Sequence, residues 1–325
     1  MKNMSICNIF SMKFILMLLF NQKGLMMAKI NKFGGNWTNT KLEVLKKYLS
    51  AYARILKKAD YYKFAYIDAF AGTGYIKDKS KKKSTNEKLL IEYDDEAQAY
   101  IKGSVKIALE SNPQFDKYIF IELDDKKVTE LNNIIDREHK ELKNKIDILN
   151  DDANIVIQKL CKQNWKKHRA VLFLDPFGME VEWSTIESIA NTKAIDLWIL
   201  FPLGISVNRM LMKKRKDIPK EWANDLDKIF GTHEWFNEFY EEKIEQTLFG
   251  KDEVISKIAN FDKIAKYYIK RLNEIFSGVI DKPMYLYNST NNPIFLLCFA
   301  SGNEKGSKPA IKIAKDIIGK MSNDN

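Results

Sequence analysis

A short turn after an apolar segment carries residues suited to holding a small ligand. The stretch "YIDAFAGTGYI" brings together Asp68, Phe70, Gly72 and Gly74. Glycines let a ligand approach the main chain closely, and a carboxylate beside them accepts hydrogen bonds from an ammonium group, directly or through water. The third glycine of the dinucleotide fingerprint is missing, because position 77 is Lys77. The turn therefore favours a ligand with an amino acid end over a pyrophosphate; the alternative is a tight structural turn.

The elements that position this turn follow from the hydrophobic pattern. Amphipathic or helix-like segments lie at 40–59, 103–111, 125–139, 153–164, 183–191 and 308–320. Apolar strand-like segments lie at 63–70, 117–124, 145–152, 169–178 and 194–204. The first helix has Thr40 as a possible cap. Repeated alternation of the two patterns predicts an α/β fold with a doubly wound, mostly parallel sheet, and places the turn at the carboxyl edge where such sheets bind ligands.

Several segments in order resemble a known family. "FGGNWTNTKLEVLKKYLSAY", "AYIDAFAGTG", "GSVKIALE", "YIFIELD" and "FLDPFGMEVEW" together are similar to the three-Cys-motif partner protein family (TcmP), a bacterial family that resembles class I S-adenosylmethionine-dependent methyltransferases. The resemblance runs from about Phe33 to the last helix. It implies a Rossmann-like methyltransferase fold, S-adenosylmethionine as cofactor and a partner protein that carries three cysteines. It implies no established substrate.

Two further acids complete the expected cofactor site. Glu122 ends the strand of "IFIELDD", where a carboxylate accepts hydrogen bonds from both ribose hydroxyls; Asp124 is the weaker candidate. Glu122 lies beyond the spacing of about 20 residues usual in nucleotide folds, and a polar insertion after the glycine turn accounts for the excess. In "ILNDDAN", Asp152 matches the position that, by the resemblance, contacts the adenine amino group, with Asp151 as a helix-capping alternative.

The segment "FLDPFG" is the expected chemical centre, comprising Asp175, Pro176, Phe177 and Gly178. An apolar strand delivers the acid to the sheet edge, and proline fixes the backbone that follows. The segment is similar to the D-P-P-Y motif of amino methyltransferases, in which the acid and a main-chain carbonyl accept hydrogen bonds from an exocyclic amine. The variant resembles the D-P-F-G of tRNA guanine-N2 methyltransferases. A strand simply stopped by proline and glycine is the alternative.

Charge points to an anionic partner. The 325 residues carry 53 Lys and Arg against 43 Asp and Glu, a net charge of +10. The runs "KDKSKKK" and "NRMLMKKRK" are candidates for contacting phosphates, with Trp198, Phe201 and Trp222 as stacking surface. A solvated surface and a core position are the respective alternatives. The three scattered cysteines and three histidines have no metal-ligand spacing, so no metal site is expected.

The expected organisation has five parts. Residues 1–26 are a non-native or disordered leader, 27–60 an N-terminal helical cap, 61–206 the methyltransferase-like core, 207–279 a helical insertion, and 280–325 the last strands and helix. The leader follows from a possible start at Met27, which would make the protein cytoplasmic, with no membrane contact. Two strand-like segments, 283–290 and 293–301, flank the turn pair "NN" and predict an antiparallel hairpin.

These observations predict an S-adenosylmethionine-dependent methyltransferase that N-methylates an exocyclic amine on a nucleic acid, either RNA such as tRNA or DNA. The alternative is a non-catalytic subunit of methyltransferase fold that works in a complex with the three-cysteine-motif partner protein. A nicotinamide dehydrogenase is disfavoured by the missing third glycine and by the lack of an obvious proton donor.

Overall fold

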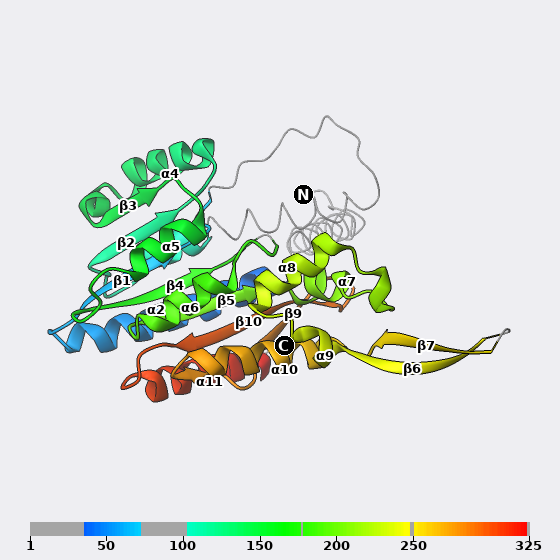
Figure 1. The fold of residues 1–325 in the computed structure, drawn as a ribbon. Coiled ribbons are helices and arrows are strands. Elements are labelled where there is room, and N and C mark those ends of the chain that lie inside the picture. Colours follow the sequence, from blue (N-terminus) through cyan, green and yellow to red (C-terminus); the bar gives the residue numbers. More distant parts are fainter. Residues whose placement is uncertain (1–35, 73–102, 177, 248–249, 324–325) are drawn as a thin grey trace, which may run out of the picture.

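The computed structural model describes residues 36–72, 103–176, 178–247 and 250–323, and these form a doubly wound α/β fold (Figure 1). The main sheet has eight strands: β1 (Lys63–Asp68), β2 (Lys117–Ile121), β3 (Ile146–Leu149), β4 (His168–Leu174), β5 (Ile195–Phe201), β8 (Gly278–Val279), β9 (Met284–Tyr287) and β10 (Pro293–Ser301). The spatial order is β3-β2-β1-β4-β5-β10-β8, with β9 also paired to β10. The fold class predicted from the sequence is confirmed.

The directions of the strands determine at which edge of the sheet a ligand can bind. Strands β1 to β5 are parallel, whereas β10 runs antiparallel to β5, β8 and β9. From β1 the chain proceeds to β2 and β3 on one side and then to β4 and β5 on the other. The order therefore reverses between β1 and β4, and in open α/β sheets ligands bind outside the carboxyl ends of the strands at such a point.

Helices cover both faces of the sheet. The longer helices are α2 (Asn36–Lys58), a helix over 103–109, α4 (Asp125–Glu138), α5 (Ala153–Cys161), α6 (Trp183–Asn191), α8 (Lys220–Phe230), α10 (Phe261–Ile275) and α11 (Ser307–Asn323). Short helical segments are η1 (Lys140–Lys145), the π-helical turn η2 (Leu203–Val207), α7 (Asn208–Met210), η3 (Arg215–Asp217) and α9 (Trp235–Phe239). One core packs α5, α6, α8 and α10 on one face, and a second packs α2, the 103–109 helix, α4 and α11 on the other. None of the helices among the described residues is long and apolar enough to cross a membrane.

The first helix starts earlier than expected. Helix α2 begins at Asn36, so Thr40 lies inside it and the predicted Thr40 cap is wrong. Trp37 is buried and its ring lies 5.4 Å from that of Phe295 in β10. This contact across the chain stabilises a helical turn that the local pattern does not indicate.

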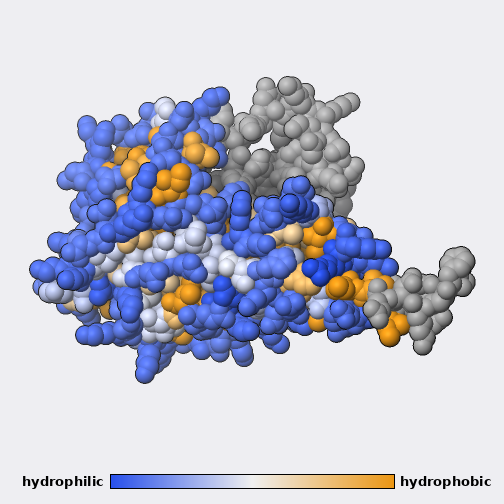
Figure 2. Space-filling view, viewed as in Figure 1, coloured by the Kyte–Doolittle hydropathy of each residue, from blue (hydrophilic) through white to orange (hydrophobic). Residues whose placement is uncertain are grey.

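The region predicted as a helical insertion also contains a β-hairpin. Strands β6 (Tyr240–Thr247) and β7 (Gly250–Lys257) pair antiparallel and extend beyond the body of the molecule (Figure 1). The main-chain N–H of Lys257 donates to the Lys213 carbonyl at 2.8 Å, which ties the basic segment to β7. Figure 2 shows apolar residues gathered near the base of the hairpin. Met212, before the hairpin, and Ile244, in β6, are exposed. The sequence pattern missed this hairpin because its charged strands lack an apolar period. Strand β8 also lies inside the range 207–279 that was predicted for the insertion.

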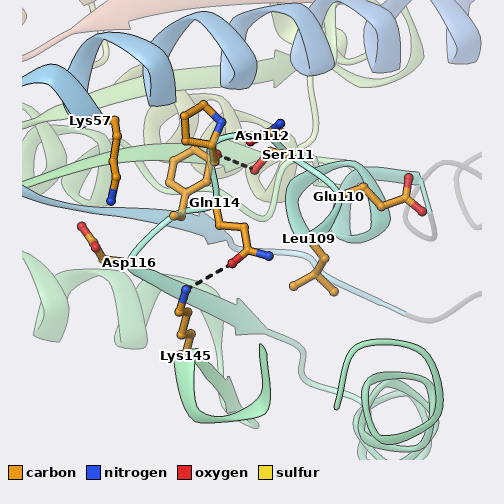
Figure 3. A pocket seen from close by; sticks show the side chains of 10 residues that line it. Lys57, Leu109, Glu110, Ser111, Asn112, Gln114, Asp116 and Lys145 are labelled. Carbon is orange, nitrogen blue, oxygen red and sulfur yellow. Dashed lines mark hydrogen bonds between the residues drawn. The ribbon is translucent and has the colours of Figure 1, made fainter. Parts of the chain in front are cut away.

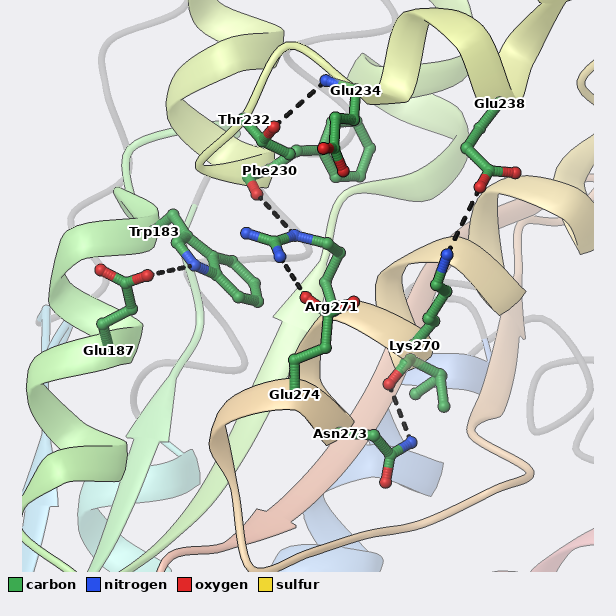
Figure 4. Close-up of polar contacts among 11 residues, drawn as sticks. Trp183, Glu187, Phe230, Thr232, Glu234, Glu238, Lys270, Arg271, Asn273 and Glu274 are labelled. Atoms are coloured by element: carbon green, nitrogen blue, oxygen red, sulfur yellow. Dashed lines mark hydrogen bonds and ion pairs between the residues drawn. The ribbon is translucent and has the colours of Figure 1, made fainter.

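The insertion is anchored on the sheet by a tight contact between α6, α8 and α10 (Figure 4). The Arg271 guanidinium lies 4.7 Å from the centre of the Trp183 ring and donates to the Phe230 carbonyl at 3.2 Å. Gly231 ends α8 with φ +68°, and a Cβ atom there would lie 2.0 Å from Trp183 Cδ1. Only glycine fits this end of the helix, since both the backbone angle and the space exclude a side chain.

The C-terminal hairpin is confirmed. Strands β9 and β10 pair antiparallel, and the turn between them is closed by the N–H of Asn288 donating to the Asn292 carbonyl at 3.0 Å. Asn291 has φ +58°, in the left-handed region that asparagine tolerates better than most residues.

Candidate functional site

The turn after β1 is fixed between two neighbouring strands. The N–H of Ala69 donates to the Phe173 carbonyl at 3.1 Å, and that of Ala71 donates to the Ile121 carbonyl at 2.9 Å. Gly72 is buried and has φ +35°. These contacts hold the start of the turn at the carboxyl edge of β1, as predicted. Gly74 lies outside the described residues.

Asp68 is a buried acid at the end of β1. Its carboxylate accepts hydrogen bonds from the Tyr66 hydroxyl at 3.0 Å and from the N–H of Phe70 at 3.4 Å, and Ser104 supplies a further hydroxyl. Burial raises the pKa of Asp68 to about 7, although these hydrogen bonds oppose the shift. The half-buried Phe70 packs against the core under α5 and α6. Through the hydrogen bond from the N–H of Phe70, Asp68 helps to fix the conformation at the start of the turn.

Glu122 follows β2 directly and is nearly buried. Its N–H donates to the Leu149 carbonyl of β3 at 3.1 Å, which places it on the same edge as Asp68. Glu122 Oε1 accepts from the N–H of Asp124 at 2.9 Å and lies 3.9 Å from Lys127 Nζ. Asp124 itself caps α4, accepting from two main-chain N–H groups that lower its pKa. The structure therefore gives Asp124, the weaker candidate, a local structural role.

The capping role expected as an alternative for Asp151 belongs to Asp152. Asp152 is the residue that caps α5, accepting from the N–H of Ile155 at 3.1 Å. Asp151 accepts from the N–H of Asp152 and pairs with Lys159 at 3.4 Å. The capping alternative given to Asp151 is wrong. Asp152 still lies at the same edge, because the loop before it donates from Asn150 to the Glu122 carbonyl at 3.0 Å.

Asp175 meets a lysine that sequence reasoning missed. It follows β4, is 8% exposed, and lies 3.3 and 3.4 Å through its two oxygens from Nζ of Lys41 in α2. Lys41 is 1% exposed, so this is a buried ion pair. Burial raises the pKa of Asp175 to about 6, and the charge of Lys41 opposes the shift. A signal was present, since Lys41 lies on the helix face that also buries Val44 and Leu45.

The rest of the D-P-F-G segment is described in part. Pro176 is buried, and the N–H of Gly178 donates to Glu180 Oε2 at 2.7 Å. A Cβ atom on Gly178 would meet nothing closer than Ser206 Oγ at 3.8 Å, so space alone does not require glycine there. Phe177 lies outside the described residues.

Two exposed apolar side chains border this edge and were also missed. Leu123 is 67% exposed beside Glu122, and Ile155 is 48% exposed in the first turn of α5. The Asn150 amide donates to the Leu123 carbonyl at 3.1 Å, which ties the two loops together. Large exposed apolar residues beside acids are suited to a planar ligand ring.

The expected stacking residues are corrected. Trp198 and Phe201 are buried in the core of β5, so their assignment as stacking surface is wrong; Trp222 is partly exposed. The run "KDKSKKK" lies outside the described residues, whereas Lys213, Arg215 and Lys216 of the second run are exposed. Among the described residues, no cluster of three His, Cys, Asp or Glu side chains is placed to hold a metal ion.

A hollow of about 510 Å³ lies at the opposite edge of the sheet (Figure 3). Lys57, Asp116 and Lys145 line it, and the last two directly precede β2 and β3. It is therefore separate from the strand-end acids, which gather at the carboxyl edge.

No family model and no curated protein matches the chain. Solved structures that resemble it include a putative S-adenosylmethionine-dependent methyltransferase from Listeria monocytogenes, 11% identical over 77% of this chain and 96% of that one, with a TM-score of 0.34. The glycopeptide N-methyltransferase MtfA complexed with S-adenosylhomocysteine is 8% identical over 78% and 89%, with a TM-score of 0.32. Spermidine synthase in complex with a transition-state analogue is 9% identical over 88% and 75%, with a TM-score of 0.35. Likenesses of this strength identify neither a family nor a substrate for the chain.

Proposed function

We propose that this protein is an S-adenosylmethionine-dependent methyltransferase that N-methylates an exocyclic amine of a nucleic acid. The observation that carries the proposal is the position of Asp68 and Asp175. Asp68 ends β1 and Asp175 follows β4, and the sheet order reverses between these two strands. Open α/β sheets bind ligands at this position, and paired acids there suit ammonium and amine groups.

The side chains at this edge have the chemical groups that S-adenosylmethionine requires. In this proposal the glycines after Asp68 let the amino acid end approach the main chain, and Glu122 accepts hydrogen bonds from the ribose hydroxyls. Leu123 and Ile155 offer apolar surface to the adenine, with Asp152 beside them. S-adenosylmethionine supplies an electrophilic methyl group on a positively charged sulfur.

The chain's contribution to the reaction is orientation and acceptance of a proton. Asp175 accepts a hydrogen bond from the acceptor amine, which directs the nitrogen lone pair toward the methyl group. Such positioning is worth about 7 to 11 kcal/mol in favourable cases. The carboxylate also stabilises the positive charge that develops on nitrogen and receives its proton late in the reaction.

Charge supports a nucleic acid as the acceptor. The chain has a net charge of +10, and Lys213, Arg215 and Lys216 are exposed between η2 and α8. Exposed basic residues of this kind contact phosphates and make affinity fall steeply with salt.

One observation favours the alternative of a non-catalytic subunit. Both oxygens of Asp175 already accept from Lys41, which leaves fewer acceptor positions for an amine. In that case the protein binds the cofactor or the three-cysteine-motif partner protein without turnover.

A methyl-transfer assay separates the two functions. The full chain is incubated with S-adenosylmethionine carrying a labelled methyl group and with tRNA, rRNA or DNA, with and without the partner protein, and the products are digested to nucleosides. Label on a base amine supports the proposal. Cofactor binding without label on any nucleic acid, with the partner present, favours the non-catalytic subunit.

A further inference from the structure

The ion pair between Lys41 of α2 and Asp175 after β4 is buried, unlike an ion pair on a solvated surface. Lys41 and Asp175 are 134 residues apart in the chain, and both are buried. The aromatic ring of Trp37 lies 4.4 Å from Lys41 Nζ, and that of Phe295 lies 5.9 Å from it. The ammonium group is thus enclosed between a carboxylate and two aromatic rings.

Such a pair is a poor way to gain stability. Removing two charges from water costs several kcal/mol for each ion, and well-packed apolar residues often replace buried ion pairs without loss. The pair also lies at the point where the strand order reverses, which is where the proposed function requires the acceptor amine. A role in the reaction explains this location better than a role in packing.

We propose, on the basis of the function proposed above, that Lys41 is a positioning residue: its ammonium group holds the Asp175 carboxylate ionised and fixed for the acceptor amine. Helix α2 thereby contributes a residue to the site from outside the parallel sheet. Lys41 acts through Asp175 and is not required to touch the substrate.

The charges around Asp175 explain why a lysine is needed. Burial favours the protonated acid, and the charge of Glu180 raises the pKa of Asp175 further. Asp68 is a third acid close enough that the charge of Asp175 raises its pKa. Tyr66 also lies within reach of the charge of Asp175. Among the described groups that set the pKa of Asp175, it is Lys41 that favours the carboxylate.

The reaction balances with the carboxylate as proton acceptor. The amine nitrogen forms a bond to the methyl carbon while the bond from that carbon to sulfur breaks, and its electron pair stays on sulfur. The nitrogen then carries a positive charge and loses one proton to Asp175. A protonated Asp175 cannot receive this proton, so loss of Lys41 lowers the rate near neutral pH.

The test compares Lys41→Met, Lys41→Arg and, as a matched control on the exposed face of the same helix, Lys46→Met. An opposite charge at this distance lowers a carboxyl pKa by about 1 to 3 units. In Lys41→Met, the acidic limb of the kcat profile therefore moves up by about 1 to 3 pH units. This corresponds to a loss in rate of about twofold to a hundredfold at pH 7, with the KM for S-adenosylmethionine little changed. Lys41→Arg restores the limb, and Lys46→Met leaves it in place.

A second measurement does not depend on turnover. The full chain with 13C-labelled aspartate is titrated by NMR, and the Asp175 signal is assigned by its loss in Asp175→Asn. The inference requires the Asp175 titration to move up in Lys41→Met and to return in Lys41→Arg. An unmoved titration overturns it, and so does a moved titration with an unchanged kcat profile, which would leave the pair a structural role. Absence of turnover in the wild type overturns the proposed function instead, while the titration still decides whether Lys41 keeps Asp175 ionised.

Discussion

Asp68 ends β1 and Asp175 follows β4, two hydrogen-bonded parallel strands, and the charge of Asp175 contributes to raising the pKa of Asp68. The two acids differ in their partners. Asp68 accepts from the neutral hydroxyls of Tyr66 and Ser104, whereas Asp175 faces the ammonium group of Lys41. This difference in environment underlies the separate roles proposed for them, cofactor binding for Asp68 and amine orientation for Asp175.

Replacement of Asp175 is expected to separate chemistry from cofactor binding. Asp175→Asn keeps the shape of the side chain but cannot accept a proton, so turnover falls by at least about a hundredfold. Cofactor affinity changes little, because the predicted cofactor contacts come from the other strands. Calorimetric titration and a methyl-transfer assay measure the two effects. Asp196→Asn is the control, since Asp196 is a buried acid that contacts Tyr48 and Ser301 in the core. Wild-type turnover in Asp175→Asn would refute the assignment.

The buried acids make stability depend on pH. The pKa of Asp68 is raised from 3.8 to about 7, so between these values the folded state holds a proton that the unfolded state has released. The free energy of unfolding therefore falls as the pH rises through this window, and Asp175 and Asp196, each with a pKa of about 6, act in the same direction.

Asp68→Asn removes one of these titrations. The loss of stability between about pH 4 and about pH 8 should be smaller in the variant, by an amount on the order of a few kcal/mol. Urea unfolding at a series of pH values measures it. An equal loss in wild type and variant would show that Asp68 titrates at its ordinary pKa.

Gly231 is expected to be intolerant of any side chain. Gly231→Ala places a Cβ atom against Trp183 at a positive φ, and we expect a loss of about 1 to 3 kcal/mol in the free energy of unfolding. Gly319→Ala in α11 is the matched control, because a Cβ atom there meets nothing within 4 Å. It should stabilise the protein by about 0.5 to 1 kcal/mol. Equal effects of the two substitutions in chemical denaturation would contradict the close packing of Gly231 on Trp183.

The basic segment before α8 gives a prediction for nucleic-acid binding. Lys213→Ala combined with Lys216→Ala should weaken binding to all sequences and reduce the salt slope by about 1 for each phosphate that the protein no longer neutralises. Arg215 is left unchanged, because its guanidinium lies 3.7 Å from the centre of the Phe236 ring. Lys308→Ala with Lys312→Ala, both exposed on α11, is the control. A wild-type affinity that does not change with salt concentration would argue against phosphate contacts.

The sheet was predictable because its parallel strands are mostly apolar segments, several of which have a polar residue at or just after the end. Asp68, Glu122 and Asp175 mark three of these ends, and parallel strands bring such ends to one edge. The same rule explains an error: Trp198 lies inside such a segment, and its burial follows from the strand rather than from its aromatic character.

Other features depend on contacts between distant residues. A lysine in a helix usually lies in solvent, and the burial of Lys41 is explained by an acid 134 residues away. Strands β6 and β7 are mostly charged and contain few apolar residues. They therefore lack the alternation of apolar and polar residues that identifies a half-buried strand. Its pairing is therefore visible only in the folded chain.

The proposed methyl transfer requires the carboxyl edge around Asp68 and Glu122 to bind S-adenosylmethionine. A thermal-shift titration of the full chain with S-adenosylmethionine, S-adenosylhomocysteine and NAD measures this binding, with Glu122→Gln as the site variant. A ligand at a hundred times its dissociation constant stabilises the folded state by about 2.7 kcal/mol, which moves the midpoint measurably. We predict a shift with the two methionine-derived ligands, none with NAD, and a smaller shift in Glu122→Gln. No shift with S-adenosylmethionine or S-adenosylhomocysteine would contradict a cofactor site at this edge.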